Sequence, residues 1–179
     1  MKRKQITYLI MTALLAALTA ALTMVPIMRL PNSGSVHLGD LFVLLAGCLL
    51  PTPYAMAAGA IGGGLADLFG SAPLWTPATI LIKSAVAALF SAKQDRLLTR
   101  RSVLMTLPYA AITLVGYALY NLLLVSLGLV PGEEVWTAIL IASISLDTLQ
   151  VLASTALFLA LAAALDRIGL KQKLMKWGR

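Results

Sequence analysis

Long apolar runs, divided by short stretches rich in proline, glycine and charge, cover most of this 179-residue chain. A run of about twenty apolar residues is long enough to cross the bilayer core as a helix. The ends of the runs predict helices over about residues 6–26, 38–51, 53–70, 76–92, 103–129 and 135–165. The pattern therefore predicts an all-α integral membrane protein, with six transmembrane helices in one bundle that forms a single domain over residues 1–179.

The second and third runs are short, and only Pro51, Thr52 and Pro53 separate them, so the chain must reverse tightly there. Four spans plus a re-entrant hairpin is therefore the alternative to six spans. The last two runs exceed the bilayer thickness, so we expect them to tilt or to extend beyond the hydrocarbon.

Composition supports a membrane protein, since 60% of the residues are apolar and 12% are charged, and the mean hydropathy is +0.90. The six-span topology gathers twelve of the fourteen basic residues on one side. They are Lys2, Arg3, Lys4, Lys93, Arg96, Arg100, Arg101, Arg167, Lys171, Lys173, Lys176 and Arg179. This asymmetry places both termini in the cytoplasm. It also accounts for the net charge of +7 together with anionic headgroups, so no nucleic-acid partner is needed.

The first run also has the basic start and small residues of a secretory signal peptide. Its apolar character continues to Pro26, and cleavage would leave five spans and break the charge asymmetry. We therefore favour a retained helix. The single cysteine, Cys48, can form no internal disulfide and is interpreted as a packing residue.

Small residues recur at four-residue spacing in two of the predicted helices. Ala13, Ala17 and Ala21 form one row on the first helix, and such a stripe lets another helix approach closely. Spacing alone favours packing inside this bundle. In the third helix Gly59, Gly63 and Ala66 form a similar stripe, and the run 62–64 of three glycines predicts a locally irregular helix against a neighbour's backbone.

Polar residues gather near one end of the predicted bundle, with Lys83 and Asp147 lying deeper. Charges inside a membrane face the bundle interior and often mark ligand sites. The candidate substrate-binding residues are His37, Asp40, Asp67, Trp75, Thr79, Lys83, Tyr117, Tyr120, Asn121, Asp147 and Gln150. This predicts a pocket open to the outside in which aromatic rings sandwich a flat ligand.

Structural alternatives exist for several of these residues. Lys83 and Asp147 could form a buried ion pair that pins two helices together. His37 could be a helix-start residue, and Asp40 and Asp67 could be capping or interfacial groups.

Sequence motifs for chemistry are absent. The chain has no phosphate-binding loop, no H-E-x-x-H motif, no paired cysteines and no nucleophile elbow. We therefore expect no enzyme activity, no catalytic residues, no cofactor and no metal site. Nor does the sequence show an obvious internal repeat of the kind that many secondary transporters carry. If the protein transports a molecule, another component must supply the energy.

The stretch from His37 to Lys83, "HLGDLFVLLAGCLLPTPYAMAAGAIGGGLADLFGSAPLWTPATILIK", resembles the substrate-binding S components of energy-coupling factor (ECF) vitamin transporters. The riboflavin and hydroxymethylpyrimidine types are the most similar. The resemblance rests on the H-L-G-D opening, the G-x-x-L-A-D-L-x-G stretch and the P-A-T-x-x-x-K stretch. It implies a small membrane protein that binds a heteroaromatic vitamin or precursor outside the cell: hydroxymethylpyrimidine, pyridoxine or riboflavin. Such a protein works with a transmembrane T component and two cytoplasmic ATPase subunits.

The resemblance changes the interpretation of particular residues. It implies that Ala13, Ala17 and Ala21 dock onto the T component rather than pack internally. It also implies that Thr79 and Lys83 face the ligand and that residues 27–36 cover the pocket. One departure is "LLPTP" at residues 49–53, where relatives commonly read L-L-G-P, so that a proline here replaces the glycine.

Two other classes remain open. A stand-alone ion- or proton-coupled carrier would use Lys83, Asp147 and Asp67 as a relay. A non-transporting membrane scaffold would use the small-residue stripes to hold partners.

Overall fold

A computed structural model describes residues 3–30, 34–70, 72–91, 94–130 and 133–177. The helices are α1 (Arg3–Met24), α2 (Gly39–Leu49), α3 (Thr52–Phe69), α4 (Thr76–Phe90), α5 (Arg100–Leu104), α6 (Thr106–Ser126), α7 (Glu133–Arg167) and α8 (Leu170–Trp177). A 3-10 turn, η1 (Pro73–Trp75), precedes α4, and strands β1 (Met28–Leu30) and β2 (Gly34–Val36) follow α1. The predicted all-helical architecture is confirmed, and each predicted helix is present within a few residues of its expected bounds.

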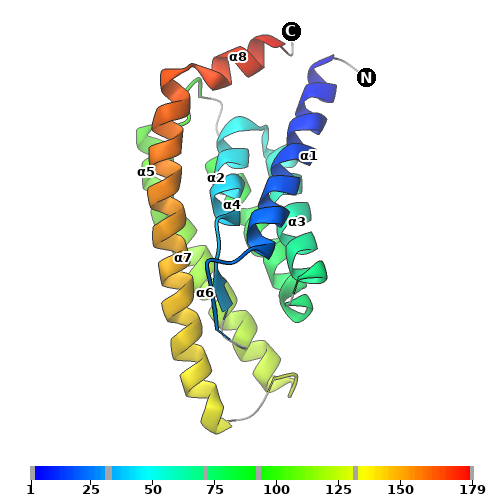
Figure 1. Cartoon of the computed structure of the whole chain (residues 1–179), viewed down its shortest axis with the longest axis vertical. Coiled ribbons are helices and arrows are strands. Elements are labelled where there is room, and N and C mark those ends of the chain that lie inside the picture. The colour runs from blue at the N-terminus through cyan, green and yellow to red at the C-terminus, as the bar shows by residue number, and fades with distance from the viewer. Residues whose placement is uncertain (1–2, 31–33, 71, 92–93, 131–132, 178–179) are drawn as a thin grey trace.

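Successive long elements run up and down through one bundle, and both ends of the chain lie at the same end of it (Figure 1). Four segments of the described chain are long and apolar enough to cross a membrane: Arg3–Met24, Pro73–Phe90, Arg100–Ser126 and Ser143–Arg167. Helix α2 is apolar but has only 11 residues. The number of spans therefore stays a prediction at six, and so does the cytoplasmic placement of the termini.

Helices α6 and α7 project beyond the other helices at the end opposite the termini (Figure 1). The 35 residues of α7 amount to about 52 Å of helix at about 1.5 Å per residue, well beyond the bilayer core. This agrees with the expectation that the last two runs extend past the hydrocarbon.

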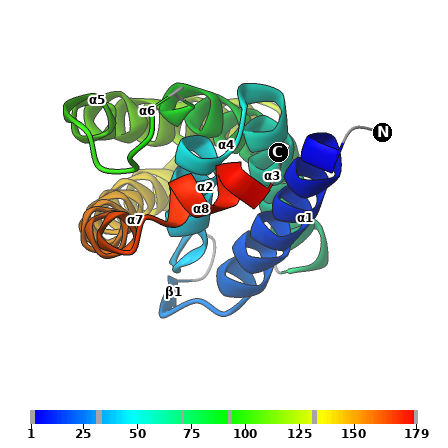
Figure 2. The ribbon, with the colours of Figure 1, turned by 90° about the horizontal axis from the view of Figure 1, so that it is seen from above.

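Two boundaries differ from the prediction. The fifth segment is two helices that meet at Met105, because Pro108 cannot donate the hydrogen bond that would join the first turn of α6 to α5. The chain also turns at Gly169, where φ is +64°, and forms the additional helix α8. Helix α8 crosses the end of the bundle over α2 (Figure 2).

Helix α3 lies between α1 and α4, and its glycines face both neighbours. A Cβ atom on Gly59 would lie 2.7 Å from the carbonyl oxygen of Lys83, and one on Gly62 would lie 2.7 Å from that of Ala16. The glycines thus allow backbone contact on two sides, as the stripe predicted. The expected irregularity at residues 62–64 is wrong, because α3 is a continuous helix.

The chain between α1 and α2 is a short antiparallel hairpin. Met28 pairs with Val36 and Leu30 pairs with Gly34, and β2 packs against α7. After β2 ends at Val36, only His37 and Leu38 precede α2, which begins at Gly39.

We expect Gly59→Ala to lower the stability of the bundle by about 1 to 3 kcal/mol, because the added methyl group would push α3 away from the backbone of α4. Thermal unfolding in detergent measures this loss. Gly64→Ala on the same helix is the control, because its Cβ would meet side-chain atoms of Ile80 and Thr76 rather than the backbone of α4, and alanine favours the helix. Equal losses in the two variants would contradict close backbone packing at Gly59.

Candidate functional site

A buried ion pair joins α2 to α4 in the middle of the bundle. The Lys83 ammonium lies 2.5 Å from Oδ1 of Asp40, and both side chains are almost completely buried. The other carboxylate oxygen of Asp40 accepts a hydrogen bond from the Tyr109 hydroxyl of α6 at 3.0 Å. Three helices are therefore tied together by one carboxylate, and each charge is compensated inside the bundle, as a low-dielectric environment requires.

The partner of Lys83 is thus Asp40, and the alternative of a Lys83–Asp147 pair is wrong. The reason is the length of α2. Its 11 residues span only about 16 Å at about 1.5 Å per residue, so its first turn lies level with the middle of α4. Asp40 is in that first turn, near the positive end of the helix dipole. The capping role considered for Asp40 is also wrong, because its carboxylate bonds to Lys83 and Tyr109 instead.

Toward the end where α6 and α7 project, polar and aromatic side chains join α4 to α6. The hydroxyls of Thr79 and Tyr117 lie 3.0 Å apart, and the Tyr117 ring lies 5.7 Å from the Lys83 ammonium. One turn further, the Trp75 indole donates to Oδ1 of Asn121 at 2.7 Å. The Tyr120 hydroxyl donates to the carbonyl of Leu74 at 2.8 Å. Five residues predicted from the sequence therefore lie in one aromatic layer between α4 and α6: Trp75, Thr79, Tyr117, Tyr120 and Asn121.

His37 and Gln150 join the hairpin to α7. The backbone N–H of His37 donates to Oε1 of Gln150 at 2.7 Å, and the Gln150 amide donates to the Ser154 hydroxyl at 3.0 Å. Nδ1 of His37 accepts from the backbone N–H of Gly39 at 3.2 Å. This bond supports the interpretation of His37 as a helix-start residue, since it satisfies a free N–H group at the start of α2. Gln150 holds the hairpin and the start of α2 in place.

Three further polar groups, Asp147, Asp67 and Thr113, lie beside this network. Asp147 is half-buried, its charge acts on Lys83 and Asp40, and no hydrogen bond to it is found within the described part of the chain. Asp67, half-buried near the end of α3, acts electrostatically on Lys83 and Tyr117. The Thr113 hydroxyl is buried and lacks a hydrogen-bond partner among the described residues.

Sequence reasoning missed Tyr109, Thr113 and Ser154. The signal for the first two was present, because Tyr109, Thr113, Tyr117 and Asn121 recur every four residues and so lie on one face of α6. All four turn toward the bundle interior. Ser154 likewise lies one helical turn after Gln150.

The alanines of α1 divide between its two faces. Ala13, Ala17 and Ala21 are exposed, whereas Ala16 is buried against α3 at Gly62. In the described structure, no other helix of this chain covers the row of Ala13, Ala17 and Ala21 that was expected to dock a partner. Packing inside the bundle uses Ala16 instead.

Comparison by sequence identifies one family. The family described as ECF-type riboflavin transporter, S component, matches residues 3–167. The match begins with α1 and ends with α7, so it contains every residue of the polar network and leaves α8 outside. No curated protein matches the chain.

We expect Lys83→Met to destabilise the protein by about 3 to 5 kcal/mol, because it leaves the Asp40 carboxylate buried without its counter-charge. Adding Asp40→Asn should recover much of this loss. A double-mutant cycle by thermal unfolding measures the coupling. The same cycle with Asp147→Asn is the comparison, and a larger coupling there would contradict the pairing seen in the structure.

Proposed function

Because the chain belongs to the family of ECF-type riboflavin transporter S components, we propose that it captures a heteroaromatic vitamin outside the cell. It is a substrate-specificity component and a multi-pass membrane protein, and its family is one of transporters rather than enzymes. The family match favours riboflavin over pyridoxine and hydroxymethylpyrimidine as the first candidate. The observation that carries the proposal is the layer of aromatic and polar side chains between α4 and α6, in a chain whose family match spans that whole layer.

The ligand would bind above the ion pair rather than displace it. Lys83 is held by Asp40, and the ring of Tyr117 lies next to its ammonium, so this pair forms the floor of the proposed site. Trp75, Tyr117 and Tyr120 supply flat apolar surfaces for stacking. Asn121 and Asp147 supply groups that orient a ring bearing hydrogen-bond donors and acceptors.

Opening of the site would break hydrogen bonds of the layer itself. The Trp75–Asn121 and Thr79–Tyr117 bonds join the start of α4 to α6, and a ligand that enters between these helices can take over both partners. The hairpin of β1 and β2 would close over the ligand, with Gln150 holding its base through His37. The Asp67 carboxylate at the end of α3 lies on the same side as this layer.

The proposed topology has six traversals and cytoplasmic termini. It is supported by the common position of both chain ends (Figure 1) and by the basic residues concentrated there. Helices α2 and α3 would together form the second and third traversals, with the tight turn at Pro51 facing the cytoplasm.

The proposed partners are a transmembrane T component and two cytoplasmic ATPase subunits. The exposed row of Ala13, Ala17 and Ala21 gives a flat surface on α1 onto which a partner helix can pack closely. A stand-alone carrier is the second candidate, since Asp67, Lys83 and Asp147 act electrostatically within one region. A non-transporting scaffold would bind no vitamin.

We expect riboflavin to raise the unfolding temperature of the detergent-purified protein more than pyridoxine or hydroxymethylpyrimidine does, since a ligand that binds only the folded state stabilises it. Asp147→Asn should raise the riboflavin concentration needed for half of this shift by about tenfold or more, because a hydrogen bond to a charged group contributes about 1.5 to 3 kcal/mol.

Ser145→Ala is the matched control on α7, because Ser145 is exposed and its hydroxyl only bonds back to Ile141. No shift with any of the three vitamins would contradict vitamin binding and favour the scaffold. If Asp147→Asn leaves the vitamin-induced shift in unfolding temperature unchanged, the ligand does not contact Asp147 of α7.

We expect Ala17→Trp to leave vitamin binding unchanged and to lower ATP-driven uptake by roughly tenfold, because a bulky side chain prevents the close helix contact that small residues allow. The measurement is vitamin uptake into vesicles that contain the T component and both ATPases. Ala85→Trp, at an exposed alanine of α4, is the control. Uptake without any ATPase would instead identify a stand-alone carrier.

A further inference from the structure

One hydroxyl in the interior of the bundle is buried without a partner. The Thr113 side chain on α6 is only 1% exposed, and its Oγ1 has no hydrogen-bond partner among the described residues. Thr76 also has a hydroxyl without a partner there, but its side chain is only half-buried. Thr113 lies in the membrane-capable segment Arg100–Ser126, where bulk water cannot replace a missing bond. A buried hydroxyl without a hydrogen bond is costly, so Thr113 requires a physical explanation.

Other hydroxyls in the helices of this protein find a partner in their own helix. Each of several serines and threonines donates to the backbone carbonyl four residues earlier, as such side chains commonly do. They are Thr12, Thr19, Ser84, Ser145 and Thr148. The equivalent acceptor for Thr113 is the carbonyl of Tyr109 in the same helix, and that bond does not form. The Thr113 hydroxyl therefore remains available to a partner outside α6.

Thr113 lies between the ion pair and the aromatic layer. Tyr109, one turn away on the same face of α6, donates to the Asp40 carboxylate. Tyr117, one turn away in the other direction, has its ring 5.7 Å from the Lys83 ammonium. The Thr113 hydroxyl is therefore at the floor of the proposed site, just below the stacking surfaces.

Donor groups near the floor are already used, and one of its other polar groups only accepts. The Lys83 ammonium and the Tyr109 hydroxyl both donate to Asp40, and an ionised Asp147 can only accept. Thr113 can donate without the loss of any existing bond within the described chain. A carbonyl oxygen or ring nitrogen that reaches the floor would therefore find its donor in Thr113.

Access to Thr113 depends on the contact between α4 and α6. The Thr79–Tyr117 bond joins these helices one turn above Thr113. A ligand that takes over this bond, as the proposed opening of the site requires, would separate the two helices at that level. The same movement would bring the ligand to the Thr113 hydroxyl.

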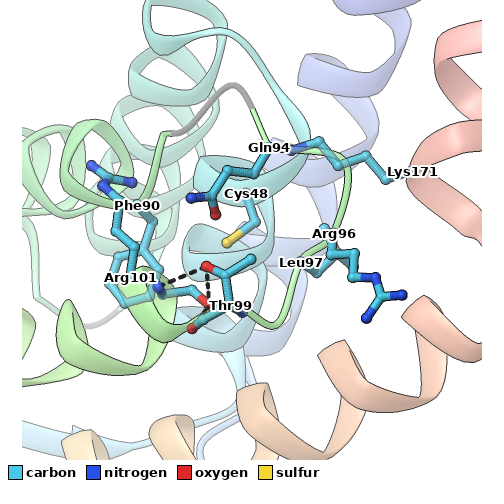
Figure 3. Close-up of a pocket in the computed structure, with 9 residues that line it drawn as sticks. Cys48, Phe90, Gln94, Arg96, Leu97, Thr99, Arg101 and Lys171 are labelled. Atoms are coloured by element: carbon cyan, nitrogen blue, oxygen red, sulfur yellow. Dashed lines mark hydrogen bonds between the residues drawn. The ribbon is translucent and has the colours of Figure 1, made fainter.

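The pocket at the opposite end of the bundle has no comparable capacity. Figure 3 shows it between α2, the end of α4, the loop before α5 and the start of α8. Its space for a water-sized sphere is about 10 Å³, enough for about one water molecule. Lys171 in its wall is buried and already interacts with Cys48, Asp95 and Asp166. This pocket is therefore part of the packing of α8 against the bundle.

We propose that Thr113 is a specificity-determining residue whose hydroxyl donates a hydrogen bond to a carbonyl oxygen or ring nitrogen of the bound heteroaromatic vitamin. This inference rests on the proposed function and deepens it. A ring that presents only C–H groups to the floor would leave the hydroxyl unpaired in the complex as well. Such a ring would bind more weakly than one with an acceptor at that edge.

The test compares Thr113→Val and Thr113→Ser with the unaltered protein in detergent. Valine has nearly the shape of threonine but no hydroxyl, and serine keeps the hydroxyl. Riboflavin affinity is measured by equilibrium dialysis, and the unfolding temperature is measured without vitamin. Thr19→Val is the matched control, because Thr19 is also 1% exposed, donates to the carbonyl of Leu15 and faces α3 at Gly62.

Thr113→Val should weaken riboflavin binding by about tenfold, because the acceptor on the ligand loses its donor while it stays buried. Its unfolding temperature without vitamin should stay the same or rise, since the substitution removes an unpaired buried hydroxyl. Thr113→Ser should bind riboflavin within about threefold of the unaltered protein, because it keeps the donor. Thr19→Val should leave the affinity unchanged.

Three results would overturn the role of Thr113 while the proposed function stands. The first is an unaltered protein that binds riboflavin with an affinity that Thr113→Val does not change. The second is a lower unfolding temperature in Thr113→Val with unchanged affinity, which would identify a structural role. The third is an equal loss of affinity in Thr113→Val and Thr113→Ser, which would assign the effect to side-chain shape. If the unaltered protein binds none of riboflavin, pyridoxine and hydroxymethylpyrimidine, the proposed function and this inference fail together.

Discussion

The buried pair of Lys83 and Asp40 is the interaction on which the rest of the bundle depends. A charge in the middle of a membrane must be compensated within the protein, and here one carboxylate meets both the ammonium of α4 and the Tyr109 hydroxyl of α6. This requirement fixes the depth of α2 relative to α4. It also leaves room above α2 for the hairpin and for the aromatic layer, because α2 is too short to fill the full height of the bundle.

Close backbone packing complements that pair. Helix α3 contacts the backbone at Lys83 through Gly59 and that at Ala16 through Gly62. In lipid, helices gain little by hiding apolar surface from one another, so small residues and polar bonds must hold them together. The same reasoning gives α1 two distinct faces. Ala16 is used inside the bundle, while Ala13, Ala17 and Ala21 form a flat exposed row suited to a second protein.

The two ends of the molecule consequently have different chemistry. At one end, aromatic rings, amides and a half-buried carboxylate form a layer suited to a flat, polar-edged ligand, in agreement with membership of the ECF-type riboflavin transporter S components. At the other end, Arg96, Arg101 and Lys171 line a small pocket beneath helix α8. The polar side chains of the two ends therefore differ in kind, with aromatic and amide groups at one end and cationic groups at the other.

The sequence by itself determined the helical membrane class, the approximate position of every long helix, the family resemblance and most residues of the aromatic layer. These follow from apolar run length, charge asymmetry and helical spacing, which are local properties of the chain. Only the tertiary structure decided that Lys83 pairs with Asp40 rather than Asp147, that Tyr109 completes the network, and that Lys171 reaches a pocket beside Cys48. Those facts depend on the relative depth of separate helices. That depth depends on contacts between helices, such as the Lys83–Asp40 pair and the close approach of α3 at Gly59, and no periodicity within a single helix encodes it.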